Sequence, residues 1–185
     1  MTSNDLPRSG LTLRLATLAD VPVLRPLMDK SIRALLKPYL DDAAIEASFE
    51  IMGIDTQLIT DGTYFAVEVD GYIAGCGGWS RRATLFGGDH SAGRDAALLN
   101  TATDAARVRA MYTDPDYARR GIGRAILNAC EDAARTEGFK RVELVATVAG
   151  EPLYAACGYA PLEKMSATTS NGTVIPLTRM GKTLA

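Results

Sequence analysis

The sequence of 185 residues is poor in the residue types that metal and disulfide chemistry require. It contains one histidine, His90, and three cysteines, Cys76, Cys130 and Cys157, none of them at metal-ligand spacing. We therefore expect no metal site and no disulfide framework. The Gly-x-Ser-x-Gly elbow of serine hydrolases is also absent. An odd, small number of thiols is typical of a cytoplasmic protein.

The sequence also lacks long apolar runs and any strong excess of charge. It has no stretch of about 18 or more apolar residues, so we expect no membrane-spanning helix. The opening residues MTSNDLPRSG do not have the basic-then-apolar pattern of a secretory signal, and we expect residues 1–10 to form a disordered tail. A net charge of −2 gives no general attraction to nucleic acid or to anionic membranes. Any functional charge must therefore be local.

What the sequence does contain is an irregular order of strand and helix patterns. Alternating apolar and polar residues predict strands, and the pairs Asp70-Gly71 and Asn171-Gly172 predict the turns of two hairpins. Single strands are predicted at 11–16, 107–114 and 141–147, and helices at 17–36, 41–54, 120–137 and 151–158, with a helical turn before 62. This order predicts one domain, residues 11–183, of the α/β class with a mixed sheet.

Two features depart from regular patterns. Residues 81–106 interrupt the order of elements as a long excursion, with one helical turn at most, and loops of this length tend to be functional or mobile. Pro176 lies in the last predicted strand, which predicts an unpaired edge or a bulge there.

The segment ARRGIGRAIL combines glycines and positive charge at the start of a helix. The first turn of a helix has free N–H groups and a partial positive charge, and Gly121 and Gly123 leave the backbone open to a ligand. Arg119, Arg120 and Arg124 add charge of the sign that a helix N-terminus disfavours, and a bound anion would resolve that conflict. The pattern predicts a site for phosphate or pyrophosphate.

Three other interpretations of these glycines compete with that one. They could serve only close packing of the helix on the sheet, with the arginines solvated. A Walker loop requires Gly-Lys-Ser/Thr, which is absent. A dinucleotide fingerprint requires a small residue where Ile126 stands, although Glu143 lies where a ribose-binding acid is expected. An NAD-dependent oxidoreductase therefore stays open as a minor alternative.

At DPDYARRGIGRAIL the sequence resembles the GNAT superfamily of acyl-CoA-dependent N-acetyltransferases, whose signature is Gln/Arg-x-x-Gly-x-Gly/Ala. A second family signature, Leu/Phe-Tyr-x-x-x-Gly-Phe/Tyr, is matched by Leu153–Tyr159. The family pattern differs at two positions, Ala118 and Thr147, where polar contacts to the cofactor are usual. The resemblance covers residues 11–183 and implies a GNAT-like fold with a central, mostly antiparallel sheet flanked by helices.

The resemblance also implies roles for individual residues. The family's tyrosine donates a proton to the leaving thiolate of coenzyme A, and that role falls to Tyr154. The end of the central strand pairs with the pantetheine arm, and the glycine turn holds the pyrophosphate. The implied cofactor-binding residues are Met111, Tyr112, Thr113, Arg119, Arg120, Gly121, Ile122, Gly123 and Arg124.

Neither the base nor the acceptor site follows from the sequence. The candidate bases are Glu68, Asp89, His90, Asp114 and Glu143, or a chain of water molecules. An acceptor pocket is expected between the first two helices and the 81–106 excursion. Its candidate aromatic lining is Tyr39, Phe49, Tyr64 and Trp79. Arg81 and Arg82 would either hold an acidic acceptor or be solvated surface groups.

The predicted activity is transfer of an acetyl group from acetyl-CoA to a primary amine in a ternary complex. The acceptor is a small molecule or a peptide or protein amine, and neither nucleic acid nor membrane is an expected partner. A homodimer is common in such families. The main alternative is a CoA-binding sensor without turnover. An acyl-enzyme on Cys157 is disfavoured because that thiol has no evident base partner.

Overall fold

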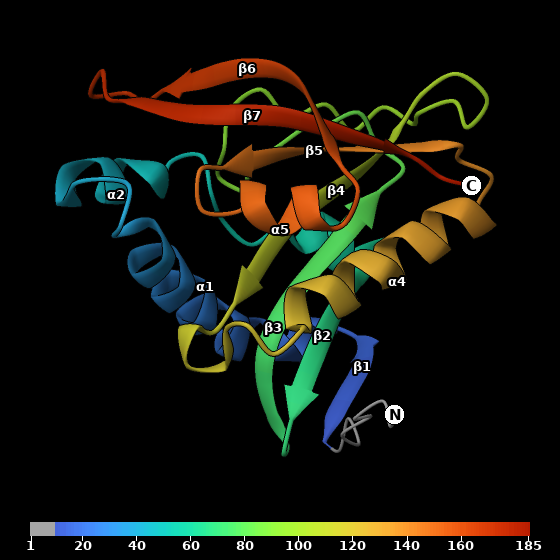
Figure 1. Cartoon of the computed structure of the whole chain (residues 1–185), viewed down its shortest axis with the longest axis horizontal. Coiled ribbons are helices and arrows are strands. Elements are labelled where there is room, and N and C mark those ends of the chain that lie inside the picture. Colours follow the sequence, from blue (N-terminus) through green and yellow to red (C-terminus); the bar gives the residue numbers. More distant parts are fainter. Residues whose placement is uncertain (1–9) are drawn as a thin grey trace, which may run out of the picture.

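A computed structural model describes residues 10–185, which form one seven-stranded sheet with helices on both faces (Figure 1). The strands are β1 (Leu11–Leu15), β2 (Tyr64–Val69), β3 (Tyr72–Ser80), β4 (Ala106–Thr113), β5 (Arg141–Thr147), β6 (Ala160–Thr168) and β7 (Val174–Thr183). The helices are α1 (Val21–Leu36), α2 (Asp42–Ser48), α3 (Thr56–Thr60), α4 (Ile122–Thr136) and α5 (Glu151–Ala156). Short 3-10 turns lie at Leu18–Asp20 and Pro115–Tyr117.

The strand order is β1-β2-β3-β4-β5-β7-β6, and neighbours in the described chain are antiparallel except β4 and β5. This confirms the predicted mixed, mostly antiparallel sheet. Separate apolar clusters cover the two faces, one under α4 and one under α1. Ala66 and Val67 on β2 belong to different clusters, because successive side chains of a strand point to opposite faces.

Local sequence signals explain several element boundaries. Asp70 and Gly71 adopt positive φ values of 50° and 82°, as the predicted turn between β2 and β3 requires. The carboxylate of Asp41 accepts a hydrogen bond from the N–H of Ala44 at 2.8 Å and caps α2. Pro176 lies just before Leu177, where the pairing of β7 with β5 begins, so its missing N–H interrupts no ladder on that side.

Some predicted boundaries were wrong. The predicted helix at 120–137 begins at Ile122, because Arg119 and Gly121 have positive φ values of 65° and 82° and cannot belong to it. The predicted helix at 41–54 ends at Ser48. The segment 81–105 contains a hydrogen-bonded turn at residues 100–104 but no helix among its described residues.

Residues 1–9 of the predicted tail lie outside the described residues. Between residues 10 and 185, no helix combines the length and the apolar character needed to cross a bilayer.

One glycine of β3 sets how closely α4 approaches the sheet. A Cβ atom on Gly75 would overlap Cγ2 of Ile122, the first residue of α4. The missing side chain therefore lets the start of α4 rest directly on β3.

Candidate active site

The sheet opens between β4 and β5. Among residues 10–185 these strands form the one parallel pair of the sheet, and they pair only at Ala106 with Val142 and Arg107 with Glu143. Both strands then continue for several residues without pairing to each other, and Figure 1 shows β4 turning away from β5. Beyond those two pairs, β4 and β5 are separated and make no backbone hydrogen bonds to each other.

A β-bulge at Ala110 accompanies the opening. Ala110 has a φ of 51°, an uncommon conformation for a residue with a Cβ atom. Its carbonyl accepts a hydrogen bond from the hydroxyl of Tyr64 at 2.7 Å. The register between β3 and β4 shifts between Cys76 and Gly78, opposite the bulge. Bulges bend a strand and re-aim its side chains, which fits the departure of β4 from β5.

The opening contains a cavity of about 830 Å³, within the size range of small-molecule and cofactor sites. One part, the α4 end, is lined by Ala118, Arg119 and residues 121–124 and by α5. The other part, the α1 end, is lined by α1 and by residues 51–53 and 85–87, together with Arg109, Val145 and Leu177. The strand residues Met111, Tyr112 and Thr113 also line the cavity.

The first turn of α4 presents open backbone to the α4 end. Gly121 caps the helix in the left-handed region, and a Cβ atom there would meet nothing within 4 Å. No side chain among the described residues caps the first-turn N–H groups, and no acid occupies that turn. Gly123 has a different role, because a Cβ atom there would lie 2.7 Å from Leu153 of α5. These features leave N–H groups free to bind an anion.

Two unpaired arginines border the same turn. Arg119 and Arg124 line the cavity, and neither has a carboxylate partner among the residues that the structure describes. Arg120 does not line it and instead lies over the ring of Tyr117, 5.1 Å from the ring centroid. The positive charge predicted at this turn is therefore present, with Arg120 facing a different way.

Tyr154, on α5, also lines the cavity. Its ring packs against Tyr159, with the ring centroids 6.0 Å apart, and a Cβ atom on Gly150 would come within 2.9 Å of it. Burial, with smaller contributions from Cys130 and Cys157, raises the pKa of Tyr154 above its ordinary value. The phenol therefore stays protonated at neutral pH and can act as an acid.

The strand residues at the cavity have partners of their own. The hydroxyl of Tyr112 accepts from the N–H of Gly53 at 3.0 Å, and the N–H of Thr113 donates to Ser31 Oγ at 3.3 Å. Burial raises the pKa of Tyr112, so its hydroxyl also stays protonated. Ala118 and Thr147, the two positions at which this sequence differs from the family pattern, both line the cavity.

Most of the aromatic residues predicted for the acceptor pocket do not line the cavity. Tyr39 does. Trp79 is buried on the α4 face against Phe139, because its position on β3 directs it away from α1. Tyr64 is fully buried in the other core, and Phe49 lies under the guanidinium of Arg33.

None of the five candidate bases is among the described residues that line the cavity. Glu68 pairs with Arg14, Asp114 with Lys30, and Glu143 with Arg107 and Arg179. Asp89 accepts from the N–H of Thr56, and His90 Nε2 lies 2.7 Å from the carbonyl of Phe49. A chain of water molecules, the remaining candidate for the base, needs none of these side chains.

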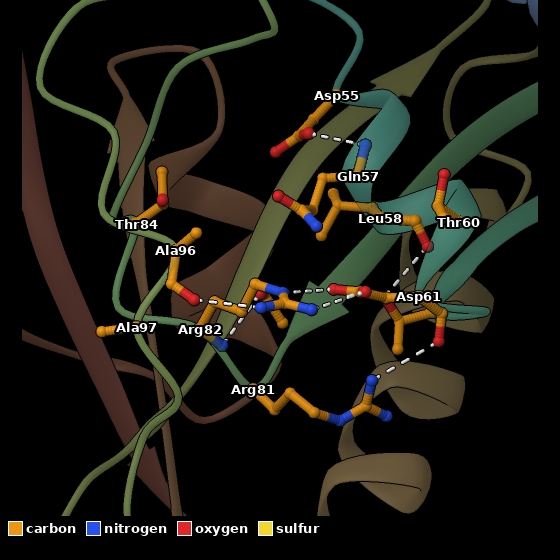
Figure 2. Close-up of polar contacts among 12 residues, drawn as sticks. Asp55, Gln57, Leu58, Thr60, Asp61, Arg81, Arg82, Thr84, Ala96 and Ala97 are labelled. Carbon is orange, nitrogen blue, oxygen red and sulfur yellow. Dashed lines mark hydrogen bonds and ion pairs between the residues drawn. The ribbon is translucent and has the colours of Figure 1, made fainter.

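Residues 81–105, here called the anchored loop, are held by ion pairs rather than lying free. Arg82 donates to both carboxylate oxygens of Asp61, at 2.7 and 2.9 Å, and to the carbonyl of Ala96 at 3.0 Å (Figure 2). Arg81 donates to the carbonyl of Asp61 and pairs with Glu137. Both arginines therefore have structural partners, and neither lines the cavity as an acceptor-holding group.

The sequence analysis missed a buried ionic cluster beside the α1 end. Asp55, which has no exposed surface, pairs with Arg109 on β4 and with Arg94 on the anchored loop. It also caps α3 through the N–H of Gln57, 3.0 Å away. An arginine between Val108 and Ala110 in a central strand was the available signal, because a buried strand rarely contains an unpaired charge.

Comparisons with known proteins agree with this geometry. Residues 29–159 match the model of the Acetyltransferase (GNAT) family. A GCN5-related N-acetyltransferase from Rhodopseudomonas palustris has a TM-score of 0.70 at 19% identity, with 95% of this chain and 97% of that chain covered. The PaiA N-acetyltransferase from Thermoplasma acidophilum, solved with coenzyme A, has a TM-score of 0.63 at 12% identity, with coverage of 94% and 98%.

A third solved structure is the phosphinothricin acetyltransferase from Sinorhizobium meliloti in complex with AcCoA. It has a TM-score of 0.63 at 19% identity, with 95% of this chain and 89% of that chain covered. No curated protein matches the chain. The family match spans more than half of the sequence, so the chain belongs to the GNAT family of acetyl-CoA-dependent N-acetyltransferases.

Proposed function

We propose that this protein transfers the acetyl group of acetyl-CoA directly to a primary amine, with both substrates bound in the one cavity. The observation that carries the proposal is the continuity of the cavity. The uncapped first turn of α4 with Arg119 and Arg124, the side chain of Tyr154 and the α1 end all line this one cavity. An anion site and an acceptor site are thus connected past a proton donor.

In this proposal the N–H groups at Gly121–Arg124 hold the pyrophosphate, and the strand residues 111–113 run beside the pantetheine arm. The amine nitrogen bonds to the acetyl carbon, the C–S bond breaks, and the CoA thiolate takes the proton of Tyr154. The attacking amine loses a proton to water. Tyr154 can serve as the donor because its side chain lines the cavity and its hydroxyl is protonated at neutral pH.

Two competing mechanisms have less support. Cys157 is not among the described residues that line the cavity, which argues against an acyl-enzyme on its thiol. A dinucleotide-binding protein requires an open, mostly parallel sheet, whereas this sheet is mostly antiparallel. Glu143, the candidate ribose-binding acid, is engaged by Arg107 and Arg179.

The test is release of free CoA thiol from acetyl-CoA in the presence of a panel of primary amines. We expect thiol release only when an acceptor amine is added. Arg119→Ala and Arg124→Ala should each raise the KM for acetyl-CoA about tenfold, because each removes a cation beside the anion site.

Arg120→Ala is the matched control. It removes the same charge from the same turn, but Arg120 does not line the cavity, so the KM should change little. Tight CoA binding with no thiol release for any amine would support a sensor instead of an enzyme. An equal effect of all three substitutions would contradict the assignment of the anion site.

The pH dependence of kcat/KM should be set by the pKa of the acceptor amine rather than by the pKa of an enzyme residue. Because no described residue lining the cavity is a carboxylate or a histidine, kcat/KM should rise with pH up to the pKa of the acceptor amine. The raised pKa of Tyr154 places the loss of its proton above about pH 10, so no fall is expected below that value. Two acceptors with different amine pKa values should show different midpoints. One shared midpoint near neutral pH would reveal an enzyme base instead.

A further inference from the structure

The charged residues that line the cavity are all of one sign. They are Arg109, Arg119 and Arg124, and no aspartate, glutamate, lysine or histidine joins them within residues 10–185. Arg119 and Arg124 lie at the α4 end, where they suit the phosphates of a nucleotide cofactor. Arg109 lies at the α1 end, away from that turn. The part of the cavity left for the acceptor is therefore positive.

Arg109 shares one carboxylate with a second arginine. Its Nη1 donates to Asp55 Oδ2 at 2.5 Å, and Nη2 of Arg94 donates to Asp55 Oδ1 at 2.9 Å. The side chains of Asp55 and Arg109 are 0% and 2% exposed. Two guanidinium groups against one carboxylate leave one positive charge without a carboxylate. Water screens the buried Arg109 side weakly, whereas the Arg94 side chain is 23% exposed.

Nη2 of Arg109 also donates to the carbonyl of Gly87, but two further observations indicate that its guanidinium group is incompletely satisfied. The Nε of Arg109 is buried and has no hydrogen-bond acceptor among the described residues. Burial lowers the pKa of Arg109, Asp55 partly opposes this effect, and the charge of Arg94 adds to the lowering. An anion bound nearby would stabilise the charged guanidinium and reverse these effects.

The walls around this charge are apolar. Ile32 and Leu36 of α1 face the cavity together with Met52, Phe86 and Leu177. The polar groups of a ligand would find no hydrogen-bond partners against these side chains. An aliphatic or aromatic group would instead bury apolar surface there.

We propose that the acceptor is a small amino carboxylate, that is, a primary amine carrying a carboxylate and an aliphatic or aromatic side chain. The carboxylate is attracted by the uncompensated charge of the Asp55–Arg94–Arg109 cluster, and the apolar group packs against α1. Polyamines and other polycations are disfavoured because their ammonium groups would meet arginine and no acid. The inference rests on the proposed acetyl transfer for its reaction, but the ligand class can be tested by binding alone.

The test compares two acetylated ligands of nearly the same shape, N-acetylleucine and N-acetylleucinamide, on the CoA-loaded protein by calorimetry. Only the first carries a negative charge, and neither has a titrating amine. N-acetylleucine should bind about tenfold more tightly, corresponding to about 1.4 kcal/mol. Arg94→Gln, which leaves Asp55 and Arg109 as a neutral pair, should reduce that preference to about twofold or less.

Arg82→Gln is the matched control. Arg82 also lies on the anchored loop and joins Asp61 to the carbonyl of Ala96, as Arg94 joins Asp55 to the carbonyl of Gly88. It should retain the tenfold preference, and thermal denaturation should confirm that both variants are folded. Equal binding of the two ligands, or a preference that survives in Arg94→Gln, would overturn the inference.

Turnover measured in parallel separates this inference from the proposed function. Faster acetylation of 3-methylbutylamine than of leucine would refute the acceptor class and leave the acetyltransferase intact. The expected binding preference, without acetylation of any amine, would refute the transferase and leave the ligand class standing.

Discussion

Replacing Tyr154 by phenylalanine should lower kcat about 10²–10⁴-fold, the usual contribution of a positioned general acid. The substitution removes only the hydroxyl, and the ring contacts with Tyr159 and Gly150 are preserved. The KM for acetyl-CoA should stay within about twofold of the wild-type value. The hydroxyl is proposed to interact with the CoA thiolate that forms during the reaction, and not with the thioester in the ground state. Steady-state kinetics with the best acceptor of the amine panel would measure both constants.

Tyr159→Phe is the control for this experiment. The hydroxyl of Tyr159 is buried next to Tyr154 and has no hydrogen-bond partner among the described residues, and Tyr159 does not line the cavity. Its removal should leave kcat nearly unchanged. A wild-type kcat for Tyr154→Phe would refute the proton-donor role, and equal losses in both variants would indicate a packing effect.

Replacing Asp55 by alanine should lower the free energy of unfolding by about 3–5 kcal/mol, as is usual when one partner of a buried ion pair is removed. The change leaves the guanidinium of Arg109, which is 2% exposed, without its carboxylate. It also removes the carboxylate partner of Arg94, in the middle of the anchored loop, and it removes the cap of α3. Urea denaturation of both proteins would measure the difference.

Asp42→Ala provides the comparison. Asp42 also pairs with a basic residue, Lys37, but its side chain is 82% exposed, and exposed pairs contribute little to stability. The midpoint of unfolding should therefore change far less. If Asp55→Ala were no more destabilising than Asp42→Ala, the cluster would not be the anchor of the loop that the contacts suggest.

The parts of the fold that could be predicted are those set by local chemistry. The Asp70-Gly71 and Asn171-Gly172 turns and the presence of a helix beside the glycine turn depend on residues within a few positions of each other. The resemblance to the family assigned the predicted cofactor-binding residues to the glycine turn and to the end of the central strand. Of those nine residues, Arg120 is the one that does not line it.

The parts that failed depend on contacts between distant segments. The wrong placement of Trp79 arose because the sequence does not reveal which face of β3 meets α1. The Asp55–Arg109 pair joins residues 54 positions apart, and no periodic pattern indicates it. The start of α4 was misplaced by two residues because Gly121, which the predicted helix included, adopts the left-handed conformation with a φ of 82° and acts as the N-cap.

The glycine of β3 that lies beneath Ile122 also has a consequence for how variation in this protein should be interpreted. Gly75 is buried and is not among the residues that line the cavity, yet the height of the turn proposed to bind pyrophosphate depends on its missing side chain. A methyl group there would lift the turn relative to β4 and alter the gap that a pantetheine arm must cross. Differences in cofactor affinity between natural variants can therefore arise from buried residues between α4 and the sheet, which do not contact the ligand themselves.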